Sequence, residues 1–245
     1  MAGRARWAIT AVFAANGLLI ATMAARAPSV KVDLGLSAGQ LGLTTAAFGI
    51  AAVLAMQGAG RLAARFGSRR VVRGAVTVLP LLLVGTALPQ NLVGLSAAFL
   101  LFGAAHGLLD VTMNAHAVAV ERELGRPILN GCHAAWSIGA VGGSLLASGA
   151  AALDLSRAVH FGLAAVLLAP AAALWTAALL PASADHETQA VRRARWSRPL
   201  VLLGAMGATV LTVEAAVANW SGIFLHEQLA APLGLAALGY VAFTA

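Results

Sequence analysis

The chain has 245 residues, of which 60% are hydrophobic and only 10% are charged, and its formal net charge is +7. A soluble domain must cover its core with polar groups, so this composition excludes a soluble globular protein. In a soluble protein the basic balance would indicate nucleic-acid binding. Here the cations form short clusters beside long apolar segments, which favours membrane topology and anionic lipid headgroups instead. We therefore expect a lipid bilayer as a partner, and no nucleic acid.

Seven apolar segments of spanning length follow one another along the chain. At a helical rise of ~1.5 Å per residue each can cross a hydrocarbon core of ~30 Å. An eighth segment begins near Leu233 and reaches Ala245, giving roughly 20 Å of helix. The sequence therefore predicts an all-α, polytopic membrane helix bundle: a six-helix N-terminal half plus about one and a half helices of a second half. The seven expected spans are Trp7–Ala25, Ala38–Leu62, Val71–Leu88, Leu92–Val120, Leu129–Ala152, Val159–Leu180 and Val201–Phe224.

One polar and basic stretch, Pro181–Pro199, divides six of these spans from the remainder. It predicts an N-terminal six-helix half at 1–180, a cytoplasmic linker at 181–199 and the start of a C-terminal half at 200–245. The last part would hold helix 7 and a partial helix 8. Because the eighth segment stops short of a full span, we expect a chain that is truncated at its C-terminus.

The cations alternate between the gaps that separate the spans, with 13 of the 16 Lys and Arg residues in every second gap. Cationic loops stay in the cytoplasm, so this alternation predicts a cytoplasmic N-terminus. Arginine far outnumbers lysine and Ala and Gly abound, a composition typical of high-GC bacteria. We expect a multi-pass protein of the bacterial inner (plasma) membrane. The inner group is Arg4, Arg6, Arg61, Arg65, Arg69, Arg70, Arg73, Arg122, Arg126, Arg192, Arg193, Arg195 and Arg198.

The segment between the second and third spans combines glycines with arginines. It resembles the G-x-L-x-D-R-x-G-R-R loop of the major facilitator superfamily, at the same place in the topology. The resemblance implies a cytoplasmic gating loop, although Ala64 stands at the family's acidic position, which puts the usual charge relay in doubt. The glycines would allow a tight turn and the arginines would latch neighbouring helices. The residues concerned are Gly60, Arg61, Arg65, Gly67, Arg69 and Arg70.

Further segments are similar to one bacterial branch of that superfamily, the fucose-permease-like sugar/proton symporters. Together with the loop they cover the whole chain. They are 26–28 with 34–37, 109–115, 125–129, 133–137, and Glu214 with 219–221. The resemblance implies a secondary transporter that moves a small organic solute by alternating access, with proton coupling through an acid on the fourth helix.

Two carboxylates, Asp110 and Glu214, fall well inside apolar spans, where an ionisable group is costly and by default functional. Asp110 lies ~27 Å along its span from Leu92, in the inner half of an extended helix. It is the expected proton carrier, and the alternative is a structural carboxylate bonded to histidine or backbone. Glu214 is either a second coupling or substrate acid or a partner for Arg26.

Four further residues are predicted to line a substrate cavity, namely Asn16, Asn114, His133 and Trp136. His106, Asp110 and Asn114 are four apart and share a helical face, and the returning fifth span brings His133 and Trp136 to matching depth. Trp136 suits stacking on a sugar. Asn16, near the middle of the first span, would contact substrate or form a helix–helix hydrogen bond.

The sequence lacks residues that known enzyme motifs require. His226-Glu227-Gln228-Leu229-Ala230 lacks the second histidine of a zinc protease helix, and no nucleophile motif or phosphate loop is present. We expect no enzymatic activity, metal or cofactor. The alternatives to a proton-coupled importer are an efflux antiporter of drugs or metabolites, and a truncated membrane fragment that transports nothing.

Overall fold

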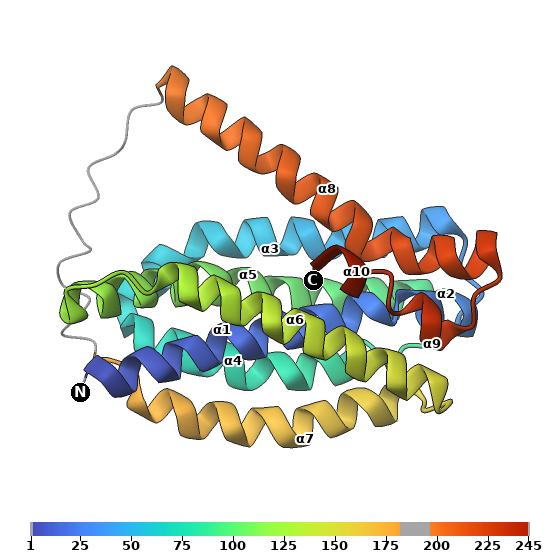
Figure 1. Ribbon diagram of the computed structural model, residues 1–245, viewed down its shortest axis with the longest axis horizontal. Helices are drawn as coiled ribbons and strands as arrows, with labels where there is room; N and C mark the ends of the chain where they lie inside the picture. The colour runs from blue at the N-terminus through green and yellow to red at the C-terminus, as the bar shows by residue number, and fades with distance from the viewer. Residues whose placement is uncertain (1, 182–196, 245) are drawn as a thin grey trace.

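The computed structural model describes residues 2–181 and 197–244, and these form helices that run roughly parallel along one long axis (Figure 1). Most of the predicted linker at 181–199 lies outside the described residues. The helices are α1 (Ala2–Ala25), α2 (Ala27–Asp33), α3 (Ala38–Phe66), α4 (Ser68–Gly85), α5 (Leu92–Leu124), α6 (Leu129–Ala152), α7 (Arg157–Trp175), η1 (Thr176–Ala178), α8 (Arg198–Leu229), α9 (Leu233–Ala236) and α10 (Val241–Thr244).

Within the described residues, six helical stretches are long and apolar enough to cross a membrane. This confirms the expected all-α membrane bundle. The helix at the third predicted span, α4, is different because its first turns carry Arg69, Arg70 and Arg73. Its later turns nevertheless bury Val76, Leu79 and Leu83, and α4 packs against α5 and α7. The six stretches are Ala2–Asp33, Ala38–Phe66, Leu92–Leu124, Leu129–Ala152, Arg157–Ala178 and Arg198–Leu229.

The centre of the bundle is α1, which is the most buried of the six stretches (Figure 1). Its main neighbour is α6, where Gly139 and Gly143 face the backbone of Ala14 and Leu18. A Cβ at either glycine would collide with those backbone carbonyl groups. In a membrane, helix association relies on close packing, so this small-residue face explains the intimate contact of α1 and α6.

The helix ends follow local signals in the sequence. Ser37 and Gln40 form a capping box at the start of α3: Ser37 Oγ accepts from Gln40 N at 3.2 Å, and Gln40 Oε1 accepts from Ser37 N at 2.8 Å. Asn91 Oδ1 caps α5 with a single hydrogen bond, which it accepts from Gly94 N at 2.8 Å. These caps fix where two of the long helices begin.

Two regions differ from the sequence-based expectation. The stretch after Ala25, expected as a loop, contains helix α2, because Pro28 lies in its first turn, where a missing N–H costs nothing. The predicted eighth span is broken into α9 and α10, joined by a turn at 237–240 that contains Gly239. Glycine is a poor helix former, which favours a break there.

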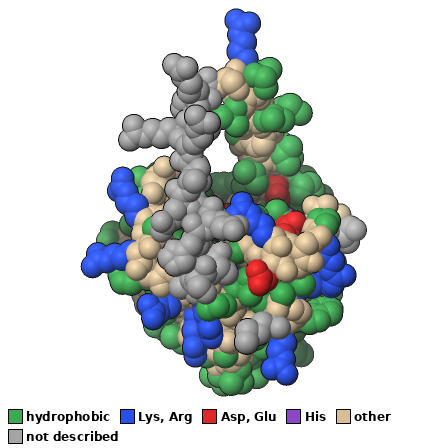
Figure 2. Space-filling model, turned by 90° about the vertical axis from the view of Figure 1, so that its left-hand side faces the viewer, with side chains coloured by type: hydrophobic (Ala, Val, Ile, Leu, Met, Phe, Trp, Pro, Cys, Tyr) green, Lys and Arg blue, Asp and Glu red, His purple; other side chains and the backbone are tan. Residues whose placement is uncertain are grey.

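The two ends of the bundle differ in charge. Figure 2 shows Lys and Arg side chains spread around the end that carries the N-terminus, with few acidic groups among them. At the opposite end the three cations lie near carboxylates. Arg157 Nε donates to Asp33 Oδ2 at 2.9 Å, Lys31 pairs with Glu227, and Arg26 lies near Asp33. The asymmetry seen in the sequence is thus an asymmetry of the folded bundle.

Helix α8 differs from the others in its exposure. Ile223 is its one buried residue, and its Arg198 end leans away from the remaining helices (Figure 1). Its other end contacts α1, α2 and α9. The predicted helix 7 therefore exists, attached to the bundle through its final turns.

Candidate functional site

A buried polar contact joins α1 to α5 in the middle of the bundle. Asn16 is fully buried, and its Oδ1 lies 3.1 Å from Nδ1 of His106. Because an amide oxygen only accepts, the Nδ1–H of His106 donates this hydrogen bond. The Asn16 amide nitrogen lies 3.9 Å from Met113 Sδ. The Asn16 side chain is therefore engaged between helices, as in the helix–helix alternative weighed for it above.

The His106 ring is further held by an aromatic neighbour on α3. It stacks on Phe48 with ring centroids 5.5 Å apart and an interplanar angle of 22°. The ring thus bridges α1, α3 and α5, three helices that meet one turn away from Asp110. Its tautomer and its plane are both fixed by contacts that the sequence places far apart.

Asp110 lies two residues past the midpoint of α5 and is half-buried. Its carboxylate makes no hydrogen bond or ion pair to any other described side chain, and His133 on α6 is its titratable neighbour. Asn114, one turn further, donates to the backbone carbonyl of Asp110 at 2.9 Å. The α5–α6 hairpin therefore brings Asp110, Asn114 and His133 together, with the carboxylate itself left available.

The two α6 residues face different surroundings. His133 is exposed, and its ring meets Phe13 of α1 edge-on, with centroids 5.3 Å apart. Trp136 is half-buried and packs in a cluster with Ala21, Ala140 and Tyr240. Trp136 is consequently directed toward the segment between α9 and α10, and His133 toward α1 and Asp110.

The second intramembrane acid lies on α8. Glu214 is half-buried, and its carboxylate is a hydrogen-bond partner of the Tyr240 hydroxyl. Arg26, the alternative partner considered for it, donates instead to the Leu155 carbonyl at 2.8 Å and lies near Asp33 and Arg157. The structure therefore places Glu214 beside Tyr240, which packs in the same cluster as Trp136.

The glycine-arginine segment is mostly helical rather than a loop. Gly60, Arg61 and Arg65 lie in the last turns of α3, so Gly60 makes no turn. The turn is made by Gly67 alone, whose φ of 83° is a conformation that glycine adopts without strain. Arg69, at the start of α4, donates to the Ala177 carbonyl at 2.6 Å and joins this turn to η1.

A buried bridge at the same end was not predicted. His116 Nδ1 lies 2.7 Å from Ser68 Oγ, and Leu180 N donates to His116 Nε2 at 3.2 Å. Because Nε2 accepts, the proton of a neutral His116 sits on Nδ1 and is donated to Ser68. The sequence signal was a histidine in an apolar helix, but its two partners lie 48 and 64 residues away.

Three hollows in the described part of the chain lie elsewhere. Each has an arginine in its wall, and none is lined by Asp110 or by the residues around it. Within residues 2–181 and 197–244, no three His, Cys, Asp or Glu side chains are arranged to hold a metal ion. The chemistry available near Asp110 is proton exchange and hydrogen bonding.

Apolar helices of membrane-spanning length, packed around a core that contains ionisable side chains, define a polytopic membrane protein. Residues 7–245 match the profile of the Major Facilitator Superfamily, and the chain belongs to this family. The match assigns it to a group of membrane transport proteins rather than to enzymes.

Curated relatives agree with this assignment. The chain is 31% identical over 242 residues to an uncharacterised transporter, y4wD, of Sinorhizobium fredii, covering 97% of this chain and 63% of the relative. It is 31% identical over 229 residues to an uncharacterised MFS-type transporter of Yersinia pestis, covering 93% and 59%. It is 30% identical over 245 residues to the membrane protein MosC of Rhizobium meliloti, covering 96% and 58%. The chain thus spans about three fifths of the length of these relatives.

A solved structure shares the fold. The crystal structure of the nucleoside transporter NupG superposes with a TM-score of 0.72 at 15% sequence identity. The superposition covers 98% of this chain and 62% of NupG. At this identity the likeness concerns the helix arrangement alone.

Proposed function

We propose that the protein is a secondary active transporter of a small organic solute, that it works by alternating access, and that Asp110 carries the coupled proton. The observation that carries the proposal is the Asp110 carboxylate itself. It is half-buried at mid-helix, has an imidazole neighbour in His133 and makes no hydrogen bond within the described residues. An acid held in a membrane bundle without a fixed partner is suited to take and release a proton.

The surrounding residues have separate tasks in this proposal. His133, which is exposed, and Asn114 line the solute path beside Asp110, and Trp136 offers an aromatic face for a sugar ring. Asn16 is fully buried, so it acts by holding His106 one turn from Asp110. Glu214, with Tyr240, is a second coupling or substrate acid on the α8 side.

The basic end of the bundle is proposed to face the cytoplasm, which puts the N-terminus inside the bacterial inner membrane. In this orientation Arg69 latches α4 to η1 on the cytoplasmic side through the Ala177 carbonyl. Carbonyl groups at a helix end attract a cation, so the latch does not need the acid that Ala64 replaces. Gly67 supplies the tight turn that places Arg69 there.

The substrate class follows from the resemblance to fucose-permease-like symporters, and sugars and related polyols are the first solutes to test. The full-length protein would be reconstituted into vesicles with an imposed pH gradient, and solute uptake and internal pH would be followed together. Solute accumulation that moves with protons supports symport. Exchange of solute against protons would establish the efflux antiporter instead, and no solute movement across the panel would favour a protein without transport activity.

A further inference from the structure

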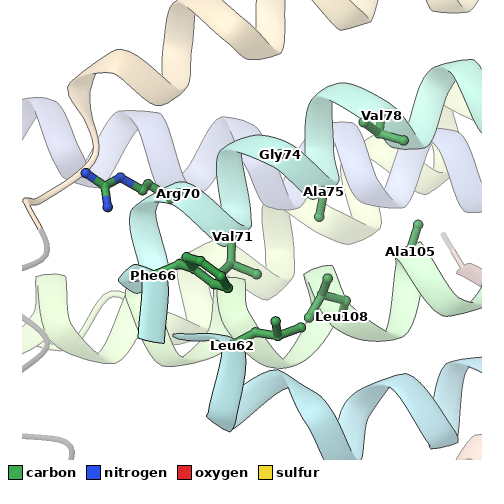
Figure 3. Close-up of a pocket in the computed structure, with 9 residues that line it drawn as sticks. All are labelled: Leu62, Phe66, Arg70, Val71, Gly74, Ala75, Val78, Ala105 and Leu108. Atoms are coloured by element: carbon green, nitrogen blue, oxygen red, sulfur yellow. The ribbon is translucent and has the colours of Figure 1, made fainter. Parts of the chain in front are cut away.

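An apolar groove runs along the outside of the bundle near its basic end, between α3, α4 and α5. It has a volume of about 420 Å³, and Leu62, Phe66 and Val78, which are exposed, form part of its wall. Figure 3 shows these side chains along the groove, with Arg70 at one end and Val78 toward the other. Such a surface on a membrane-spanning bundle faces lipid.

A second hollow adjoins the groove at Arg70. It has a volume of about 390 Å³ and is lined by Arg69, Arg70, Arg73 and Pro181. Arg70 lines both hollows. None of the three arginines forms a salt bridge with another described residue. A strongly cationic pocket and an apolar groove thus share one side chain.

We propose that the two hollows together bind one anionic glycerophospholipid, with an acyl chain in the groove and the phosphate beside Arg70. Guanidinium groups bind phosphate oxygens through paired, charge-assisted hydrogen bonds, and basic pockets at membrane helix ends attract anionic headgroups. The apolar wall excludes a polar solute from the groove. The requirement for a charged end joined to an apolar tail selects a lipid over a free anion.

The headgroup part and the acyl-chain part of the proposed site can each be tested by one substitution. Arg70→Gln removes the headgroup charge. Gly74 lines the groove and has nothing within 4 Å of the position of a Cβ, so Gly74→Leu fills the groove without a backbone collision. The matched controls are Arg126→Gln and Gly131→Leu. Both residues are exposed, neither lines the hollows, and Gly131 is equally unobstructed.

The test is native mass spectrometry of the full chain in detergent, with dioleoylphosphatidylglycerol and dioleoylphosphatidylcholine added at equal concentration. The wild type is expected to retain phosphatidylglycerol preferentially. Arg70→Gln should weaken phosphatidylglycerol retention about fivefold, the factor that corresponds to roughly 1 kcal/mol per arginine at an anionic surface. Gly74→Leu should reduce retention of both lipids, because it blocks the chain rather than the headgroup.

The proposal would be overturned if each test variant retained lipid as well as its control. Arg70→Gln is compared with Arg126→Gln, and Gly74→Leu with Gly131→Leu. Circular dichroism and size-exclusion profiles establish that each variant is folded. If Arg70→Gln does not fold, Arg70→Lys takes its place. The comparison of Gly74→Leu with Gly131→Leu then decides whether the groove binds lipid. Lipid binding is read without any transport assay, so the result is independent of the proposed transport function.

Discussion

The fully buried Asn16 on α1 accepts a hydrogen bond of 3.1 Å from Nδ1 of His106 on α5. The contact fixes the tautomer of a histidine that lies one helical turn from Asp110. Asn16 therefore has a structural hydrogen bond between helices, whereas the sequence alone presents it as one of several equivalent polar groups.

This hydrogen bond predicts a measurable coupling between the two residues. Asn16→Leu and His106→Phe are each expected to lower the apparent melting temperature in detergent, because each leaves a partner without its hydrogen bond. The double variant should lose less than the sum, with a coupling of about 0.6–1.7 kcal/mol, the range for polar side-chain pairs in membranes. Strict additivity in this double-mutant cycle would contradict the contact.

The contact of α1 with α6 predicts that alanine substitutions at two adjacent glycines have different effects on stability. Gly143→Ala should lower the melting temperature and the yield of folded protein, because its Cβ would collide with the Leu18 backbone carbonyl. Gly142→Ala should be neutral or slightly stabilising, since nothing lies within 4 Å of its Cβ and alanine favours the helix. Thermal unfolding of both variants tests this prediction. An equal fall in melting temperature for the two variants would contradict the α1–α6 contact.

The sequence predicts the helix bundle well because the bilayer imposes a simple rule: each span must be long and apolar. Helix α6 matches its prediction at both ends. The α3–α4 junction was less predictable, because the arginines read as a loop while the backbone continues as helix up to Phe66. Long arginine side chains can reach the membrane surface from within a helix.

The site was predictable in its residues but not in their partners. The i, i+4 spacing placed His106, Asp110 and Asn114 on one face of α5. Only the fold reveals that Asn114 bonds the Asp110 backbone and that Asn16 reaches His106. The Ser68–His116 bridge depends on helix rotation and crossing, which periodicity does not specify.

Two ion pairs at the less basic end are predicted to differ in strength. Asp33→Asn should destabilise the protein by about 1–2 kcal/mol, because it leaves the buried Arg157 without its carboxylate while Asp33 itself is half exposed. Glu227→Gln, which breaks the pair with Lys31, should have a smaller effect, because Lys31 is less deeply buried than Arg157. Melting temperatures at low and high salt check this, and a larger loss for Glu227→Gln would contradict it.

The Arg69 latch predicts a local effect at η1. Arg69→Gln should accelerate backbone hydrogen exchange at residues 176–181, because the Ala177 carbonyl loses its cationic donor. Arg61→Gln is the control, since Arg61 is exposed and lies on α3 away from this turn. Hydrogen–deuterium exchange measured by mass spectrometry should show a difference between the two variants that is confined to this segment. Equal exchange in the two variants would contradict the Arg69 latch.

The central claim is that Asp110 carries the coupled proton. Asp110→Asn is compared with Asp154→Asn, the same change in an exposed turn where φ is 53°, a conformation that asparagine accepts. Once a transported solute is known, both variants are assayed in vesicles for accumulation driven by a pH gradient and for solute exchange at equilibrium, which needs no net proton movement. The account predicts that Asp110→Asn abolishes accumulation while keeping exchange, and that Asp154→Asn keeps both. Gradient-driven accumulation by Asp110→Asn at the wild-type level would contradict it.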